Sequence, residues 1–237
     1  MTVNLEKLKT LADGFGVELS DEKLALFENY AGKLVEKNKV MNLTAITDPD
    51  GIAVKHFADS LSVFSIINPD NGAKVIDVGT GAGFPSVPML IARPDLKLTM
   101  LDSTAKKLAF IAESLEDMGI DATTLHSRAE EAGQSKSYRE SFDFCVSRAV
   151  ASLNVLAEYC LPFVKVGGTF VAMKGAKAQE EIDAAAAAIK LLGGEITGVK
   201  SFSLADDGER NLVFIKKISQ TPTKYPRVSA QISKKPL

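Results

Sequence analysis

The chain has 237 residues, of which 46% are hydrophobic and 24% charged, with 17 Gly, 9 Pro and no Trp. These proportions are typical of a globular protein and exclude a collagen-like, disordered or coiled-coil chain. The two cysteines, Cys145 and Cys160, lie within apolar segments, which excludes a disulfide framework and a Cys-rich zinc site, and we expect no metal. The apolar runs are too short for a signal peptide or a membrane span, so a cytoplasmic protein is expected.

The net charge of −2 is unevenly distributed along the chain. Residues 216–237 contain six Lys or Arg and no acid, whereas the remainder contains 22 basic and 30 acidic residues. A basic terminal segment can bind phosphates. The composition also fits an ordinary solvated terminus, and both interpretations remain open.

The first fifty residues contain apolar side chains at helical spacing. Ser20, followed by two acids, favours a helix start at that point. We therefore predict a helical cap over residues 1–50. A further helix is predicted over 52–67, where it is ended by a turn sequence rich in Asn, Pro and Gly.

From residue 74 onward, short apolar runs alternate with longer amphipathic ones. This alternation predicts right-handed βαβ units, and hence an α/β fold with a mainly parallel sheet and helices on both faces. Two final strands joined by a polar turn at 205–209 would form an antiparallel hairpin. The expected strands are 74–78, 97–102, 122–126, 142–147, 169–174, 196–202 and 211–217, and the expected helices are 86–92, 105–118, 152–160 and 178–192. The expected domain thus spans 51–217, followed by a basic tail over 218–237.

The first of these strands runs into a loop in which glycine occupies positions 79, 81 and 83. Ligands of open α/β sheets bind outside the carboxyl ends of the strands, where glycines let the backbone approach them closely. Phe84 stands where a dinucleotide-binding loop has its third glycine. Asp77, just before the loop, suits a cofactor that carries an ammonium or sulfonium group, such as S-adenosylmethionine.

Two polar residues mark the ends of later strands. Asp102 can accept hydrogen bonds from both ribose hydroxyls of an adenosine, which S-adenosylmethionine and NAD share. The alternative for Asp102 is an N-cap of the helix that begins near Ala105. Arg148 is a permanent cation with a planar fork of donors, and we expect it to project into the crevice above the glycine loop and to add little to stability. The alternative is a structural Arg148 whose stem covers the sheet edge and whose head pairs with a neighbouring acid.

Eight short motifs, in order from residue 42 to the end of the last strand, together resemble the bacterial family of small-subunit ribosomal RNA methyltransferase G, also called glucose-inhibited division protein B. They are Asn42 to Thr44, His56 to Ser60, Asp77 to Pro85, Leu101 to Ser103, Ser127 to Glu131, Phe142 to Ala149 with Ala151 to Leu153, Met173 to Gly175 and Asp207 to Arg210. The resemblance implies a Rossmann-like class I S-adenosylmethionine-dependent methyltransferase fold. It also implies methylation of guanine N7 in a loop of 16S rRNA near the decoding site.

The resemblance implies a cofactor site, an RNA surface and one positioning residue. The cofactor-binding residues expected are Asp77, Gly79, Gly81, Gly83, Phe84, Asp102, Ser103, Ala129, Glu130 and Arg148. The RNA-binding residues expected are Asn42, His56, Lys174, Arg210, Lys224 and Arg227. Guanine N7 has an in-plane lone pair and no proton, so no general base is expected, and Arg148 is assigned to positioning. His56 would shape a lid over the site or serve as a hydrogen-bonded structural residue.

The expected partner is 16S rRNA or a small ribosomal subunit particle, bound by a monomer that does not enter a membrane. Two alternatives remain open at this stage. An NAD-dependent oxidoreductase is disfavoured by Phe84 and Asp77. A non-catalytic RNA-binding protein of ribosome assembly, with the same fold, would retain the cofactor loop without turnover.

Overall fold

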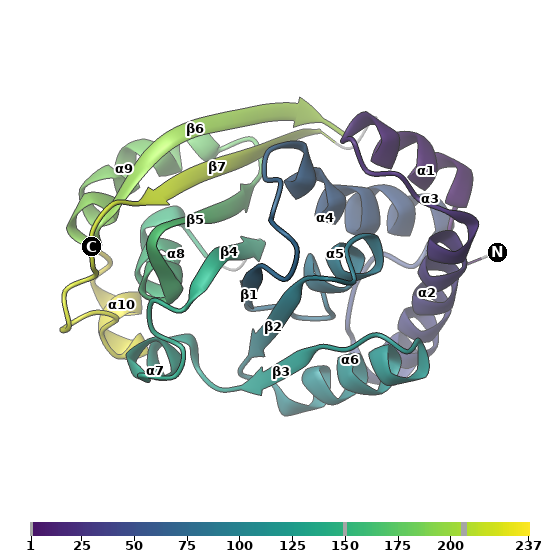
Figure 1. Ribbon diagram of the computed structural model, residues 1–237, viewed down its shortest axis with the longest axis horizontal. Helices are drawn as coiled ribbons and strands as arrows, with labels where there is room; N and C mark the ends of the chain where they lie inside the picture. Colours follow the sequence, from purple (N-terminus) through teal and green to yellow (C-terminus); the bar gives the residue numbers. More distant parts are fainter. Residues whose placement is uncertain (1, 149–150, 205–207) are drawn as a thin grey trace.

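The centre of the molecule is a seven-stranded sheet (Figure 1). The structure is a computed structural model that describes residues 2–148, 151–204 and 208–237. The strands follow the order β3-β2-β1-β4-β5-β7-β6, in which β1 to β5 are parallel and β7 is antiparallel to both of its neighbours. Their bounds are β1 Lys74–Val78, β2 Lys97–Asp102, β3 Thr123–His126, β4 Phe142–Arg148, β5 Val164–Lys174, β6 Gly194–Ser203 and β7 Glu209–Lys217.

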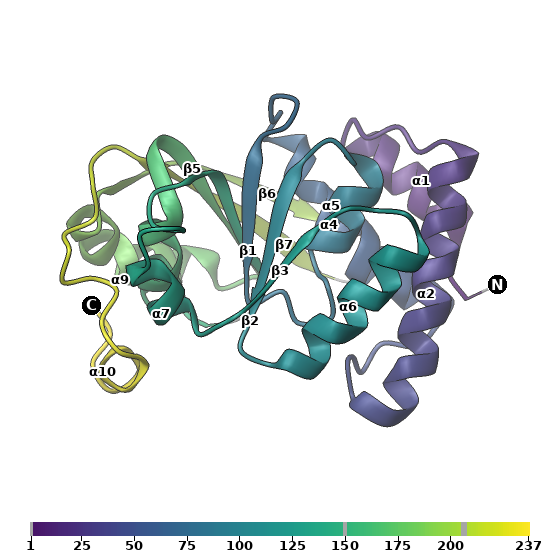
Figure 2. The ribbon, with the colours of Figure 1, turned by 60° about the horizontal axis from the view of Figure 1, so that its bottom comes forward.

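Helices cover both faces of the sheet (Figures 1 and 2). On one face lie α1 (Leu5–Gly14), α2 (Asp21–Met41), α5 (Ser86–Ala92) and α6 (Ala105–Asp117). On the other lie α7 (Ala129–Gln134), α8 (Leu153–Cys160), the short 3-10 helix η3 (Leu161–Phe163) and α9 (Ala178–Leu191), with α10 (Ser229–Lys234) packed against α8. Within the described residues, no helix is long and apolar enough to cross a membrane.

The side chains of successive strand residues pack into hydrophobic cores on opposite faces, because side chains alternate across a sheet. Val75 belongs to the cluster that contains Phe27 and Tyr30 of α2, whereas its neighbour Ile76 belongs to the cluster under α8 and α9. The amino-terminal helices therefore share one core with the sheet. Ser20 caps α2 as expected, since its side chain accepts a hydrogen bond from the Lys23 N–H at 3.4 Å.

The predicted order of strands and helices is confirmed along the sheet, with small changes of bounds. Strand β5 begins five residues earlier than the expected 169, because Gly167 and Gly168 obscure its apolar pattern. The short helices α7 and α10, six residues each, are not predicted, since one and a half turns give no helical period. Within the expected hairpin turn, residues 205–207 lie outside the described residues.

The helix predicted over 52–67 is instead a continuous series of four helical segments. They are α3 (Pro49–Gly51), the π-helix η1 (Ile52–Ala58), α4 (Asp59–Leu61) and the 3-10 helix η2 (Ser62–Ser65). The series starts early because the Asp48 side chain accepts a hydrogen bond from the Gly51 N–H at 2.7 Å, with Pro49 in the first turn. π-helical turns are rare and occur often at functional sites.

Candidate active site

The glycine loop (Gly79–Gly83) follows β1, and its three glycines have left-handed backbones. Gly79, Gly81 and Gly83 have φ values of 78°, 60° and 81°, which side chains with a Cβ rarely adopt. The N–H groups of Gly79 and Thr80 donate to the carbonyl oxygen of Leu101 at 2.9 and 3.1 Å, which ties the loop to β2. A Cβ on Gly81 would lie 4.0 Å from the Gly79 carbonyl oxygen. The middle of the loop is therefore open to close approach by a ligand.

Tyr30 of α2 supports the loop from behind. A Cβ on Gly83 would come within 2.6 Å of the Tyr30 hydroxyl oxygen. That hydroxyl donates to the carbonyl oxygen of Ala82 at 2.7 Å, and burial raises the pKa of Tyr30, so the group stays a donor. Sequence reasoning missed this role, because helical spacing marks Tyr30 as a core residue and says nothing about its hydroxyl.

Asp102 presents its carboxylate beside the loop, at the carboxyl end of β2. Its Oδ2 accepts from the Gly81 N–H at 3.0 Å, and its Oδ1 accepts from the Thr104 N–H at 2.8 Å. The N-cap of α6 is Thr104, so the alternative that Asp102 caps this helix is wrong. Because each carboxylate oxygen has a second lone pair, both can still accept a hydroxyl. The half-buried carboxylate is thus fixed in place with acceptor capacity to spare.

Asp77 lies beneath the glycine loop and is fully buried. The Ser86 hydroxyl donates to its Oδ2, whereas its Oδ1 has no hydrogen-bond partner within the part of the chain that the structure describes. Burial raises the pKa of Asp77 to about 7, although the hydrogen bond from Ser86 lowers it. Direct contact between Asp77 and the cofactor stays a prediction, since the side chain does not reach the surface.

The remaining predicted cofactor residues lie around the ends of β2 and β3. Ser103 is exposed directly after Asp102, and Ala129 and Glu130 form the first turn of α7 just beyond β3. The Ser127 N–H donates to the carbonyl oxygen of Asp102 at 3.3 Å, so the two strand ends adjoin. These positions extend the site from the glycine loop toward α7.

Phe84 lies between the glycine loop and a neighbouring pocket. The His56 ring stacks on the Phe84 ring with centroids 4.4 Å apart and an interplanar angle of 12°. The guanidinium carbon of Arg148 lies 5.1 Å from the same ring centroid. His56 and Arg148 also line a polar pocket of about 420 Å³. The lining of this polar pocket is Ile46, Lys55, His56, Asp59, Arg148, Met173, Lys174, Gly175, Arg210, Asn211 and Leu212.

An ionic cluster forms one wall of the polar pocket. The Arg148 Nη1 donates to Asp59 Oδ2 and to the carbonyl oxygen of Lys55, both at 3.0 Å, and the Arg210 Nε lies 3.3 Å from Asp59 Oδ1. Burial raises the pKa of Asp59 while the two arginines lower it. Arg148 is therefore held by its neighbours and is not the freely projecting side chain expected from the sequence. Removing it would leave a buried carboxylate with one cation fewer, so the expected small effect on stability is also revised.

The π-helix η1 contributes two groups to the wall of the polar pocket. It carries the Lys55 carbonyl that Arg148 binds, and it carries His56, whose Nε2 lies 2.7 Å from the Thr44 hydroxyl oxygen. Burial and the nearby Arg148 lower the pKa of His56 to about 4, so the ring is neutral near pH 7. This geometry is that of a hydrogen-bonded histidine packed within the site wall.

The other residues predicted to bind RNA divide into two groups. Lys174 and Arg210 line the polar pocket with His56, but the Lys174 ammonium is bound by Glu181 at 2.6 Å and by the Ala151 carbonyl at 2.5 Å. Those outside the pocket are Asn42, which is exposed at the end of α2, Lys224, which is exposed over the Tyr225 ring, and Arg227.

Arg227 is not the solvated tail residue that the sequence suggested. Its Nε and Nη2 donate to Oε1 and Oε2 of Glu158 at 2.8 and 2.6 Å, and Glu158 is fully buried. Its guanidinium therefore has a structural partner, since a buried carboxylate needs a paired cation. The RNA contact expected of Arg227 stays a prediction, and the ion pair with Glu158 gives this side chain a structural role as well.

The donors and acceptors at the loop fit S-adenosylmethionine. Asp102 offers two fixed oxygens to ribose hydroxyls, and the open backbone at Gly81 allows close approach. The buried Asp77, with one unpartnered oxygen beneath the loop, favours a positive charge nearby. A pyrophosphate would meet the Asp102 carboxylate here and would be repelled.

Known proteins with similar sequences and folds identify the family. Residues 23–213 match the family described as rRNA small subunit methyltransferase G. A protein named ribosomal RNA small subunit methyltransferase G from Acetivibrio thermocellus is 52% identical over 228 residues, covering 95% of this chain and 93% of that protein. One of the same name from Lactobacillus johnsonii is 49% identical over 228 residues, covering 94% and 95%.

The fold is also shared with solved methyltransferase structures. The structure of a SAM-dependent O-methyltransferase from Thermotoga maritima matches with a TM-score of 0.55 and 13% identity, covering 80% of this chain and 73% of that one. The class I methyltransferase fold predicted from the sequence is confirmed, and an NAD-dependent oxidoreductase is no longer supported. The matched family region and the near full-length identity lead to one conclusion. The chain belongs to the rRNA small subunit methyltransferase G family.

Proposed function

We propose that this protein transfers a methyl group from S-adenosylmethionine to N7 of a guanine in 16S rRNA. S-adenosylmethionine, when bound, supplies a methyl group on a positively charged sulfur. Asp102 would hold the ribose, the glycine loop would approach the methionine portion, and Ser103, Ala129 and Glu130 would surround the nucleoside end. Family membership supports the reaction, and the donor set of the loop supports the cofactor.

The observation that carries the proposal is that Phe84 belongs to both halves of the site. In the sequence, Phe84 directly follows the glycine loop. Its ring contacts His56 and Arg148 of the polar pocket. A base held in this pocket would lie next to the cofactor loop. Arg148 and Arg210 offer donors suited to the O6 edge of guanine or to a phosphate, so the pocket is the proposed place of the target nucleotide.

The side chains around the pocket fit a reaction that needs no general base. Both oxygens of Asp59 interact with arginines, and His56 is tied to Thr44. Guanine N7 has no proton to remove. Catalysis would then depend on holding nucleophile, methyl and sulfur in line, which can contribute up to roughly 7 to 11 kcal/mol. Arg148 would act by positioning, because it cannot accept a proton.

The partner and the setting follow from the same proposal. We infer that the enzyme acts as a monomer in the cytoplasm, on 16S rRNA or on a small ribosomal subunit particle. The exposed Asn42 and Lys224, with the pocket residues Lys174, His56 and Arg210, are the proposed contacts to RNA around the target nucleotide.

The test is a transfer assay with radiolabelled S-adenosylmethionine. The acceptors are 16S rRNA and small subunits purified from cells that lack the enzyme, compared side by side. Incorporation into one of them, dependent on Asp102, supports the proposal and identifies the acceptor. Binding of RNA with no incorporation into either acceptor would favour the non-catalytic assembly protein.

A further inference from the structure

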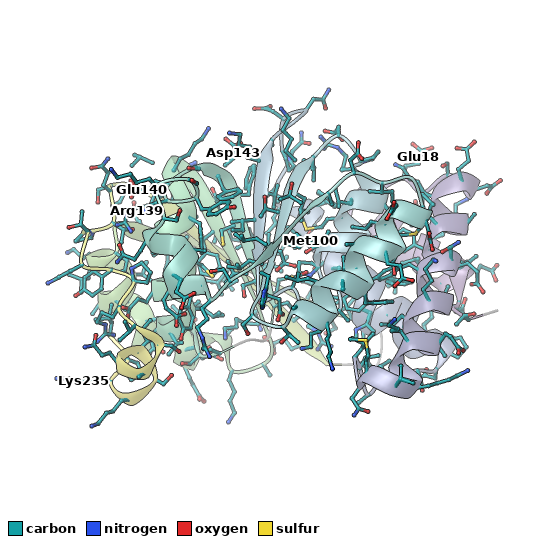
Figure 3. The ribbon with its side chains drawn as sticks, turned by 90° about the horizontal axis from the view of Figure 1, so that it is seen from below. Glu18, Met100, Arg139, Glu140, Asp143 and Lys235 are labelled. Carbon is teal, nitrogen blue, oxygen red and sulfur yellow. The ribbon has the colours of Figure 1, made fainter. Side chains whose placement is uncertain are left out.

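The C-terminal segment (residues 218–237) folds back onto the layer of helices that contains α7. Arg139 fixes it by donating from Nη2 to the Thr221 carbonyl at 2.7 Å and from Nη1 to the Tyr225 and Gly133 carbonyls at 2.8 and 3.0 Å. Figure 3 shows Arg139 and Glu140 beside this segment. The Glu140 Oε1 accepts from the Thr221 N–H at 2.7 Å. The segment is thus built into the fold over this stretch.

The carboxyl end of α7 contacts the C-terminal segment directly. The Gln134 side-chain amide donates to the carbonyl oxygens of Thr223 and Pro226 at 3.2 and 3.0 Å. At Gly133, a Cβ would come within 3.1 Å of the Pro226 ring. These contacts leave α7 little room to move away from the segment.

A buried ion pair holds the same segment from the other side. The pair between Arg227 and the fully buried Glu158 of α8 joins the residue after Pro226 to the core. Releasing the segment would take the Arg227 cation away from the Glu158 carboxylate, which disfavours release.

The opposite end of α7 lies at the cofactor site. Helix α7 has only six residues, and it starts at Ala129 directly beyond the carboxyl end of β3. The preceding Ser127 N–H bonds the Asp102 carbonyl at 3.3 Å. In sheets of this kind a ligand lies outside the strand ends, so a nucleoside on Asp102 faces the first turn of α7. A shift of so short a helix would move both of its ends together.

We propose that the C-terminal segment positions α7 for cofactor binding, with Gln134 as the positioning residue that transmits this effect. The inference rests on the proposed function only in placing S-adenosylmethionine on Asp102. It assigns the segment a second role beside any contact of its lysines with RNA. Since coupling is reciprocal, a bound cofactor must also stabilise the docked segment by the same factor.

The test measures binding of S-adenosylhomocysteine by calorimetry to the full-length chain. Gln134→Ala removes both hydrogen bonds, and Gln134→Glu keeps the size while replacing the donor by a carboxylate that faces two carbonyls. The matched control is Gln179→Ala, because Gln179 is also exposed and its side-chain amide bonds Asp183 within α9, at 2.8 Å. We expect about fivefold or more weaker binding for both Gln134 variants, in the range of ordinary coupling factors. The control should bind like the wild type.

A second measurement separates positioning from general damage. Hydrogen exchange of the Tyr225 amide, which bonds the Pro222 carbonyl at 2.9 Å, should slow when S-adenosylhomocysteine saturates the wild type and the control. The effect should be lost in Gln134→Ala at a melting temperature near that of the wild type. Unchanged affinity in both Gln134 variants overturns this inference alone. No binding to the wild type overturns the proposed function, and this inference with it.

Discussion

The hydroxyl of Tyr30 in helix α2 donates a 2.7 Å hydrogen bond to the carbonyl oxygen of Ala82, in the middle of the glycine loop. The amino-terminal helices thereby set the shape of a loop about fifty residues further along the chain. Tyr30→Phe should leave a buried carbonyl unsatisfied and cost about 1 to 3 kcal/mol in unfolding free energy.

The Tyr30→Phe variant should also bind S-adenosylhomocysteine more weakly, because the loop loses its support. Urea unfolding and calorimetry measure the two effects. Ser114→Ala is the control, since it removes a buried 2.7 Å hydroxyl-to-carbonyl bond within α6, away from the loop. Cofactor affinity equal to that of the wild type in Tyr30→Phe would show that the hydroxyl serves the fold alone.

Asp102 is expected to anchor the cofactor ribose. Asp102→Ala should weaken binding of S-adenosylhomocysteine roughly tenfold to a hundredfold, because hydrogen bonds to a charged acceptor contribute about 1.5 to 3 kcal/mol. Asp121→Ala removes an exposed acid just before β3 and should bind normally. If both variants bind like the wild type in calorimetry, Asp102 does not belong to the cofactor site.

Asp77 predicts a pH-dependent stability. Its pKa is raised from 3.8 to about 7 by burial, so the folded state holds this proton more tightly than the unfolded chain. The stabilising contribution is complete below about pH 4 and is lost as the pH rises to about 7. Relative to Asp77→Asn, the wild type should lose roughly 1 to 4 kcal/mol over that interval. Chemical unfolding at several pH values measures it, and parallel curves for the two proteins would contradict the assignment.

Arg148 is expected to matter for both stability and reaction. Arg148→Ala leaves the buried Asp59 with Arg210 and should lower unfolding free energy by roughly 1 to 4 kcal/mol. Methyl transfer per folded molecule should fall by orders of magnitude, and Arg148→Lys should restore more stability than activity, because Lys lacks the planar fork. Single-turnover rates beside thermal melts separate the effects. Near-normal turnover per folded molecule would make Arg148 purely structural.

The lysines from the end of β7 to the end of the chain divide by exposure. Lys217 is fully buried, where it bonds the Leu161 carbonyl at 2.7 Å, whereas Lys224, Lys234 and Lys235 are exposed. Changing these three to Gln should reduce the magnitude of the salt slope of RNA binding by up to about 2, at roughly 0.7 per phosphate contact. Binding of S-adenosylhomocysteine should not change. An unaltered slope would indicate that the exposed lysines do not contact RNA.

The order of elements could be predicted from the sequence because hydrophobic period and turn residues carry it locally. Strand β1 and helix α5 have the predicted bounds, and the glycines of the loop were recognisable since their backbone conformation requires them. The acid at the end of β2 was recognisable in the same way, from its place after an apolar strand.

Contacts between distant segments could not be predicted in this way. The ion pair of Arg227 with Glu158 joins residues 69 apart, and the role of Arg148 depends on Asp59, 89 residues earlier. A basic residue reads as solvated until its buried acid is known. The π-helix likewise has no local signal, so the turn that presents His56 and the Lys55 carbonyl emerged only from the fold.

The most direct test of the central claim locates the methyl group in the RNA. After incubation of unmodified 16S rRNA or small subunits with the protein and S-adenosylmethionine, reduction and aniline treatment cleave the chain at N7-methylguanosine. The account predicts cleavage at one guanine, absent when Asp102→Ala or Arg148→Ala replaces the wild type. Methyl incorporation without such cleavage, or at another base, would contradict it.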